Sequence, residues 1–130
     1  APGEAAAKYG SGRFTALRVN ESDSTPASAA DAPRSYVADP DVYRVVTQDD
    51  RTKMVLGTWK PGQRDAWHSH PARAEYFLTD CDIRVYTPEG NYSDRFRKEG
   101  FGYLAGPVAS HSFENRGSAE CRMLMVEQGP

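Results

Sequence analysis

From about residue 41 onward, short runs of β-branched and aromatic residues alternate with turn signals. The runs include "VYRVVTQ", "TKMVLGTWK", "IRVYT" and "ECRMLMVEQ", and the turns include "PGQ" and "PEGN". Together they predict about eight strands at the spacing of an antiparallel sandwich or barrel. Stretches with the period of a helix are absent. The chain is therefore expected to be all-β, with a jelly-roll or Greek-key barrel.

Length and charge exclude several classes of protein. A chain of 130 residues suits a single domain. The formal net charge of −2 offers no basic excess that would neutralise phosphates, so a nucleic-acid binder is not expected. No apolar run approaches the roughly 20 residues of a membrane span, so no membrane partner is expected either.

Residues 1–40 differ in composition from the rest of the chain. They are rich in Ala, Ser, Pro, Gly and Asp, as in "ESDSTPASAADAPRS". Such a segment buries little apolar surface, so we expect an extended N-terminal arm or linker that adds little to the stability of a domain at 41–130. One piece, "RFTALRV", alternates apolar and polar residues. It would form a strand if the arm joins the domain or a partner subunit.

The three histidines of the chain indicate its class of function. His68 and His70 stand two apart, and side chains at that spacing on a strand point to the same face. Glu75 follows beyond Pro71, where a hairpin would return it beside the two imidazoles. His111 opens a later strand that a barrel would bring to the same cavity. Three imidazoles and a carboxylate suit one divalent transition metal ion (Fe, Mn, Ni, Cu, Co or Zn) and leave coordination positions open.

These residues lie in two segments that resemble the two motifs of the cupin superfamily. In "PGQRDAWHSHPARAEYFLTD" the residues that match the first motif in type and spacing are Gly62, His68, His70 and Glu75. In "GFGYLAGPVASHSFEN" the residues that match the second are Gly100, His111 and Asn115. Asp82 and Val108 stand where the motifs usually carry glycine, which affects the turns and not the ligands.

The resemblance covers about residues 41–128 and carries several implications. It is strongest to small single-domain bacterial cupins that bind metal. It implies a cupin-like jelly-roll barrel that pairs as a homodimer. It also implies a single metal ion held by His68, His70, Glu75 and His111.

Strand alternation predicts which side chains share the cavity with these ligands. With the histidines facing inward, the expected substrate-binding residues are Arg64, Phe77, Tyr103, Phe113, Met123 and Met125. For the apolar members plain core packing is the more usual role, and Arg64 would more often be solvated. Large side chains of the opposite parity, at Trp67, Tyr76 and Leu78, would face outward. They would need cover from a sheet edge, the arm or another subunit.

The expected function is an enzyme that acts on a small organic substrate at a centre of three histidines and one glutamate. By analogy with the family, dioxygenase-type oxidoreductase chemistry ranks first, and isomerase, lyase or decarboxylase chemistry follows. Glu75 would serve as a ligand or as a catalytic base. The alternative is a non-catalytic module that binds a metal ion or a small ligand.

Cys81 and Cys121 leave two interpretations open. In the jelly roll that the resemblance implies, the strand ending at Cys81 and the strand beginning at Cys121 are antiparallel neighbours, so the two could form a disulfide. Two reduced cysteines that fill space in the core are equally compatible with the sequence. A disulfide would favour an oxidising compartment, the periplasm or the exterior, and free thiols would favour the cytoplasm. The sequence leaves the location undetermined.

Overall fold

The computed structural model describes residues 31–129 and confirms the predicted all-β fold. Within that range no helix is long and apolar enough to span a membrane. The described elements, in chain order, are α3 (Ser35–Ala38), β1 (Tyr43–Gln48), β2 (Thr52–Trp59), β3 (His68–His70), β4 (Arg73–Phe77), β5 (Cys81–Tyr86), β6 (Tyr92–Arg97), β7 (Gly102–Ala105), β8 (Val108–Asn115) and β9 (Cys121–Gln128).

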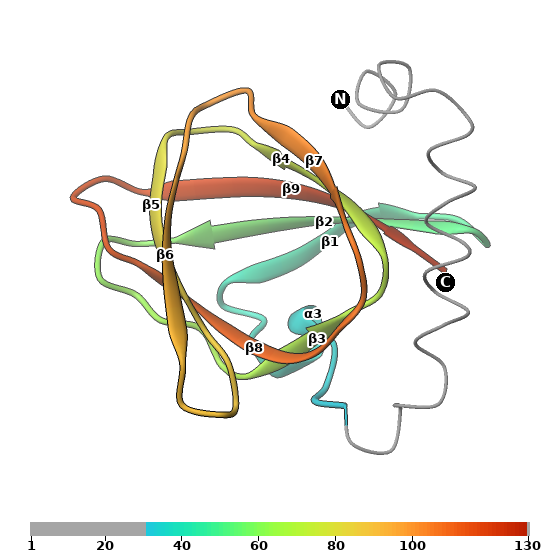
Figure 1. Ribbon diagram of the computed structural model, residues 1–130. Helices are drawn as coiled ribbons and strands as arrows, with labels where there is room; N and C mark the ends of the chain where they lie inside the picture. The colour runs from blue at the N-terminus through green and yellow to red at the C-terminus, as the bar shows by residue number, and fades with distance from the viewer. Residues whose placement is uncertain (1–30, 130) are drawn as a thin grey trace.

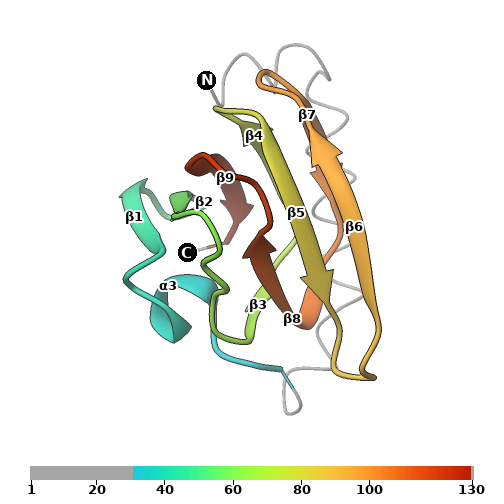
Figure 2. The same cartoon turned by 90° about the vertical axis from the view of Figure 1, so that its left-hand side faces the viewer.

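The strands form two antiparallel sheets that face each other in a jelly roll (Figures 1 and 2). The five-stranded sheet has the order β1-β2-β9-β4-β7, and the four-stranded sheet has the order β3-β8-β5-β6. No hydrogen-bonded ladder joins β6 to β7 or β1 to β3 among the described residues, so the barrel is not closed by hydrogen bonds. Among these residues β6 and β7 are therefore edge strands.

The core lies between the sheets because the strands alternate strictly. In β2 and β9 every second side chain is buried, and the two strands pair over eight residues, from Thr52–Gln128 to Trp59–Cys121. Gly57 is required by this packing, since a Cβ there would lie 2.5 Å from the Trp59 ring. The buried cluster comprises Val42, Tyr43, Val55, Trp59, Phe77, Cys81, Ile83, Val85, Phe113, Cys121, Met123 and Met125.

The end of the expected N-terminal arm packs against the four-stranded sheet. Residues 31–40 include α3, which lies beside β3 in Figure 1. The backbone N–H of Ser69 donates to the carbonyl of Pro33 at 2.8 Å, and the N–H of Ala32 donates to a carbonyl of β8 at 2.9 Å. Residues 1–30, with "RFTALRV", lie outside the described residues. The hydrogen-bonded body thus includes residues N-terminal to position 41.

Cys81 and Cys121 form a disulfide, with their Cα atoms 5.2 Å apart. The bridge differs in place from the sequence expectation. Cys81 begins β5 and does not end the preceding strand, because β4 stops at Phe77 and the chain then crosses to the other sheet. The disulfide therefore ties the four-stranded sheet to the five-stranded sheet, and both cysteines are buried in the core.

Candidate metal centre

Antiparallel pairing of β3 with β8 brings the three histidines together. His68 lies directly opposite His111, and a register shift separates that pair from His70 and its partner Val108. One ring nitrogen from each histidine lies within 4.8 Å of the others, and all three side chains are buried. The ring centroids are 4.7 to 5.1 Å apart. The short strand and its partner thus gather imidazoles from two distant parts of the chain.

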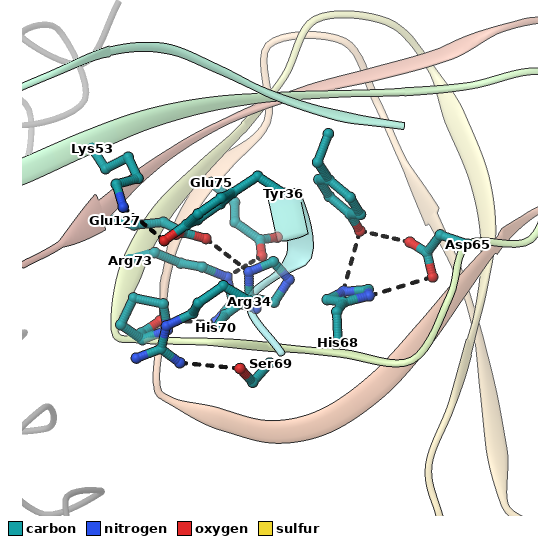
Figure 3. A network of polar contacts seen from close by, with 12 residues as sticks. Arg34, Tyr36, Lys53, Asp65, His68, Ser69, His70, Arg73, Glu75 and Glu127 are labelled. Atoms are coloured by element: carbon teal, nitrogen blue, oxygen red, sulfur yellow. Dashed lines mark hydrogen bonds and ion pairs between the residues drawn. The ribbon is translucent and has the colours of Figure 1, made fainter. Parts of the chain in front are cut away.

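Hydrogen bonds on the outer nitrogens orient two of the rings. The Nδ1–H of His68 donates to the carbonyl of Ala66 at 2.7 Å. Nδ1 of His70 lies 2.8 Å from Oε2 of Glu127, a contact drawn in Figure 3. A carbonyl or carboxylate partner of this kind fixes the tautomer of a metal-binding histidine and leaves Nε2 for the ion.

The electrostatic setting keeps the three imidazoles neutral. Burial lowers the pKa of His68, against the opposing effect of Asp65. Burial and then the Arg73 charge lower the pKa of His70 well below its usual value. Burial and the neighbouring His68 lower the pKa of His111 to about 2. A neutral imidazole has a free lone pair, which is the form that binds a metal ion.

Two buried polar atoms indicate that the site fits a cation. Nε2 of His111 and Oε1 of Glu75 are buried and make no hydrogen bond of ordinary geometry with the described residues. An unsatisfied buried acceptor is costly, commonly by about 1–3 kcal/mol. A metal ion bound by the imidazoles would satisfy the first of these atoms, and the second lies on the glutamate of the predicted ligand set.

Glu75 lies inward on β4 but outside the close group of histidine nitrogens. Its Oε2 accepts a hydrogen bond from Nε of Arg73 at 2.7 Å, and both side chains are buried (Figure 3). Burial and then the Glu75 carboxylate raise the pKa of the Tyr103 hydroxyl to about 12. Arg73 and Tyr103 are therefore the immediate electrostatic neighbours of Glu75.

Asp65 organises a second group of polar contacts beside the histidines, which sequence reasoning missed. Its Oδ2 accepts hydrogen bonds from the hydroxyl of Tyr43 at 2.6 Å and from Nε1 of Trp59 at 3.1 Å. Its Oδ1 accepts the backbone N–H of Phe113 at 2.8 Å. The Tyr43 oxygen then lies 3.2 Å from Nε2 of His68. Asp65 thus holds in place the tyrosine that contacts a candidate ligand.

An open pocket of about 350 Å³ adjoins His111. Of the expected substrate-binding residues, Tyr103 and Phe113 line it. Phe77, Met123 and Met125 do not line it and lie in the core. The remaining lining residues are Arg73, Val85, Arg95, Ala105, Gly106, Pro107 and Val108.

Arg64 does not share the inward face of His68 as strand alternation suggested. It is exposed, its guanidinium lies 3.7 Å from the centroid of the Tyr86 ring, and its Nε donates to Ser112 at 3.0 Å. The reason is that β3 begins only at His68, so alternation does not extend back through the preceding loop. In that loop Asp65 turns inward in its place.

Comparison with known proteins supports the fold. No family model matches the chain, and no curated protein matches it. A cupin domain from Bordetella pertussis aligns with a TM-score of 0.63 and 20% identity, over 76% of this chain and 97% of that one. A double-stranded β-helix protein from Klebsiella pneumoniae aligns with a TM-score of 0.54 and 22% identity, over 68% and 76%. A Cupin_2 domain of a transcriptional regulator from Enterobacter cloacae aligns with a TM-score of 0.53 and 11% identity, over 68% and 96%.

The chain has the cupin fold. This confirms, at the level of the fold, the resemblance that the two histidine motifs indicated. In addition, the structure gathers the three histidines of those motifs into one group with the geometry of a possible metal site.

Proposed function

We propose that the protein is a metal-dependent enzyme that acts on a small organic substrate in the pocket beside His111. One observation carries the proposal: three buried imidazoles converge, and one of them, that of His111, lines an open pocket. A purely structural metal site would instead have all its ligand directions filled by the protein. Here His111 belongs both to the ligand group and to the pocket lining.

In this proposal His68, His70 and His111 hold one divalent transition metal ion, with Glu75 beside them as fourth ligand or as base. When bound, the ion supplies Lewis acidity and, if redox-active, the capacity to activate dioxygen. The Arg73 guanidinium holds one carboxylate oxygen of Glu75, and Oε1 remains to contact the ion or to take up a proton. Dioxygenase-type chemistry is our first choice, followed by isomerase, lyase or decarboxylase chemistry.

Metal content in variants tests the site. We expect one metal ion per chain in the purified protein, and loss of most of it in His68→Ala and His111→Ala. Ser110→Ala is the matched control, because it changes the neighbouring position of β8 and removes no imidazole. Full metal content in both histidine variants would refute the site.

Water access to the ion separates an enzyme from a binding module. We expect the Mn(II)-loaded protein to enhance the relaxation of water protons, since the pocket leaves coordination positions open to solvent. A fully loaded protein without this enhancement would have a closed coordination shell. That result would replace the enzyme with the alternative, a module in which the metal has a structural role.

We also propose that the protein is a homodimer that pairs through the outer face of its five-stranded sheet. Leu56, Leu124 and Tyr76 form a row across β2, β9 and β4, and all three are only half-buried. A second copy would cover this apolar row. We expect a dimer in light scattering and a monomer for Leu124→Arg. A monomeric unmodified protein would refute the pairing.

A further inference from the structure

The pocket beside the candidate metal centre carries a positive charge that the proposed chemistry does not use. Of the ten described residues that line it, two are arginines and none is acidic. Arg73 is already engaged, since its Nε donates to Glu75 at 2.7 Å and its Nη1 donates to the carbonyl of Gly106 at 2.9 Å. Arg95 forms no ion pair within residues 31–129. Its charge therefore remains uncompensated in this part of the chain.

Strand register directs Arg95 toward the space between the sheets. It pairs with Ile83, a buried residue of β5, so it lies on the inward face of β6. Tyr103 pairs with Glu75 of β4 and lies on the inward face of β7 in the same way. Within residues 31–129 no ladder joins the edge strands β6 and β7. Arg95, which is exposed, and Tyr103, which is half-buried, both line the pocket from these two edge strands.

Arg95 shares its pocket with one residue of the candidate metal centre. His111 lines the same pocket as Arg95. Val85 of β5 and Phe113 of β8, which belong to the same sheet as Arg95, give the pocket an apolar wall. The pocket therefore combines the cation of Arg95, an apolar wall and the imidazole of His111.

We propose that the substrate or ligand of this pocket is a small organic carboxylate with an apolar body. The carboxylate binds the guanidinium of Arg95, and the apolar body lies against Val85 and Phe113 with its far end toward His111. The volume of about 350 Å³ is at the lower end for small-molecule sites, which excludes large ligands. This inference rests on the proposed function, because it names the substrate class of the same site.

Matched acids and amides test the proposal, since each pair has nearly the same shape and differs in charge. The probes are benzoate with benzamide and butyrate with butyramide, titrated into the purified protein and followed by NMR chemical shifts of the pocket residues. We expect each acid to bind about tenfold more tightly than its amide, as for a charge-assisted hydrogen bond at a partly exposed site. In Arg95→Gln this preference should disappear, and in Arg95→Lys part of it should remain.

Arg122→Gln is the control, because it removes the same charge from an exposed strand position that does not line this pocket. Equal binding of acid and amide, no binding by either acid, or equal effects of Arg95→Gln and Arg122→Gln would each overturn the proposal.

Metal content measured on the same samples separates this inference from the proposed function. A full metal complement without a preference for acids overturns the carboxylate proposal alone. A preference for acids that depends on Arg95, in protein that binds no metal, supports the carboxylate site and overturns the metal-dependent function.

Discussion

Breaking the Cys81–Cys121 disulfide should destabilise the domain strongly. The bridge joins positions 40 residues apart and connects the two sheets. In the chain-entropy description, a loop of this length restricts the unfolded chain by about 4 kcal/mol at 25 °C. Reduction leaves both sulfur atoms in a buried core, so the loss of free energy should come mainly from the freed unfolded chain. For a domain of this size, that loss corresponds to a fall in Tm of roughly 15–30 °C.

Thermal unfolding followed by circular dichroism measures the effect. We expect a much lower Tm for the unmodified protein in the presence of a phosphine reductant. The double variant Cys81→Ala/Cys121→Ala serves as the control, because it should unfold at a low Tm that the reductant does not change. A reductant effect of the same size in the double variant would show that the bridge is not its cause. Two titratable thiols in unreduced, denatured protein would refute the reasoning altogether.

Three further substitutions test the packing around the candidate metal centre. Gly57→Ala should lower the free energy of unfolding by about 1–3 kcal/mol, because its Cβ would lie 2.5 Å from the ring of Trp59. Gly106→Ala is the control: a Cβ there would have no atom within 4 Å, so this variant should unfold like the unmodified protein. Asp65→Ala should cost about 3 kcal/mol in urea unfolding, since it removes the acceptor of three hydrogen bonds, and a negligible loss would contradict its central role. Glu127→Gln should weaken metal binding about 10- to 100-fold in competition with a chelator, and an unchanged affinity would show that its contact with His70 does not support the site.

The histidine cluster could be predicted from the sequence because it depends on short-range geometry. Strand alternation predicts that His68 and His70 share a face, and the structure places both on β3, although a register shift lies between them. Only the approach of His111 required the fold, and a motif resemblance supplied it. Where the alternation argument was extended beyond the strand, to Arg64, it failed, because a loop residue has no fixed parity.

Other parts of the site depend on which strands become neighbours. Arg95 belongs to a strand whose side chains are mostly exposed, so nothing in its local pattern predicts a place at a pocket opening. That place results from the two sheet orders, in which β6 and β7 are edge strands among the described residues. The same holds for the disulfide. The sequence places Cys81 near the end of a strand, but the crossing of the chain to the other sheet decides that the bridge connects the two sheets.

Strand alternation predicts the burial of Glu75 but not its interactions. Parity places both Arg73 and Glu75 on the inward face of β4, and the structure buries both. Strand alternation does not predict that the two side chains form an ion pair with each other. That interaction is known only from the structure, in which Nε of Arg73 lies 2.7 Å from Oε2 of Glu75. The consequence for the site is specific. Oε2 already accepts a hydrogen bond from Arg73, so Oε1 is the oxygen that we expect to act as ligand or base in the proposed function. Arg73→Gln would release Oε2, and it should change how tightly the metal binds even though it leaves all three histidines in place.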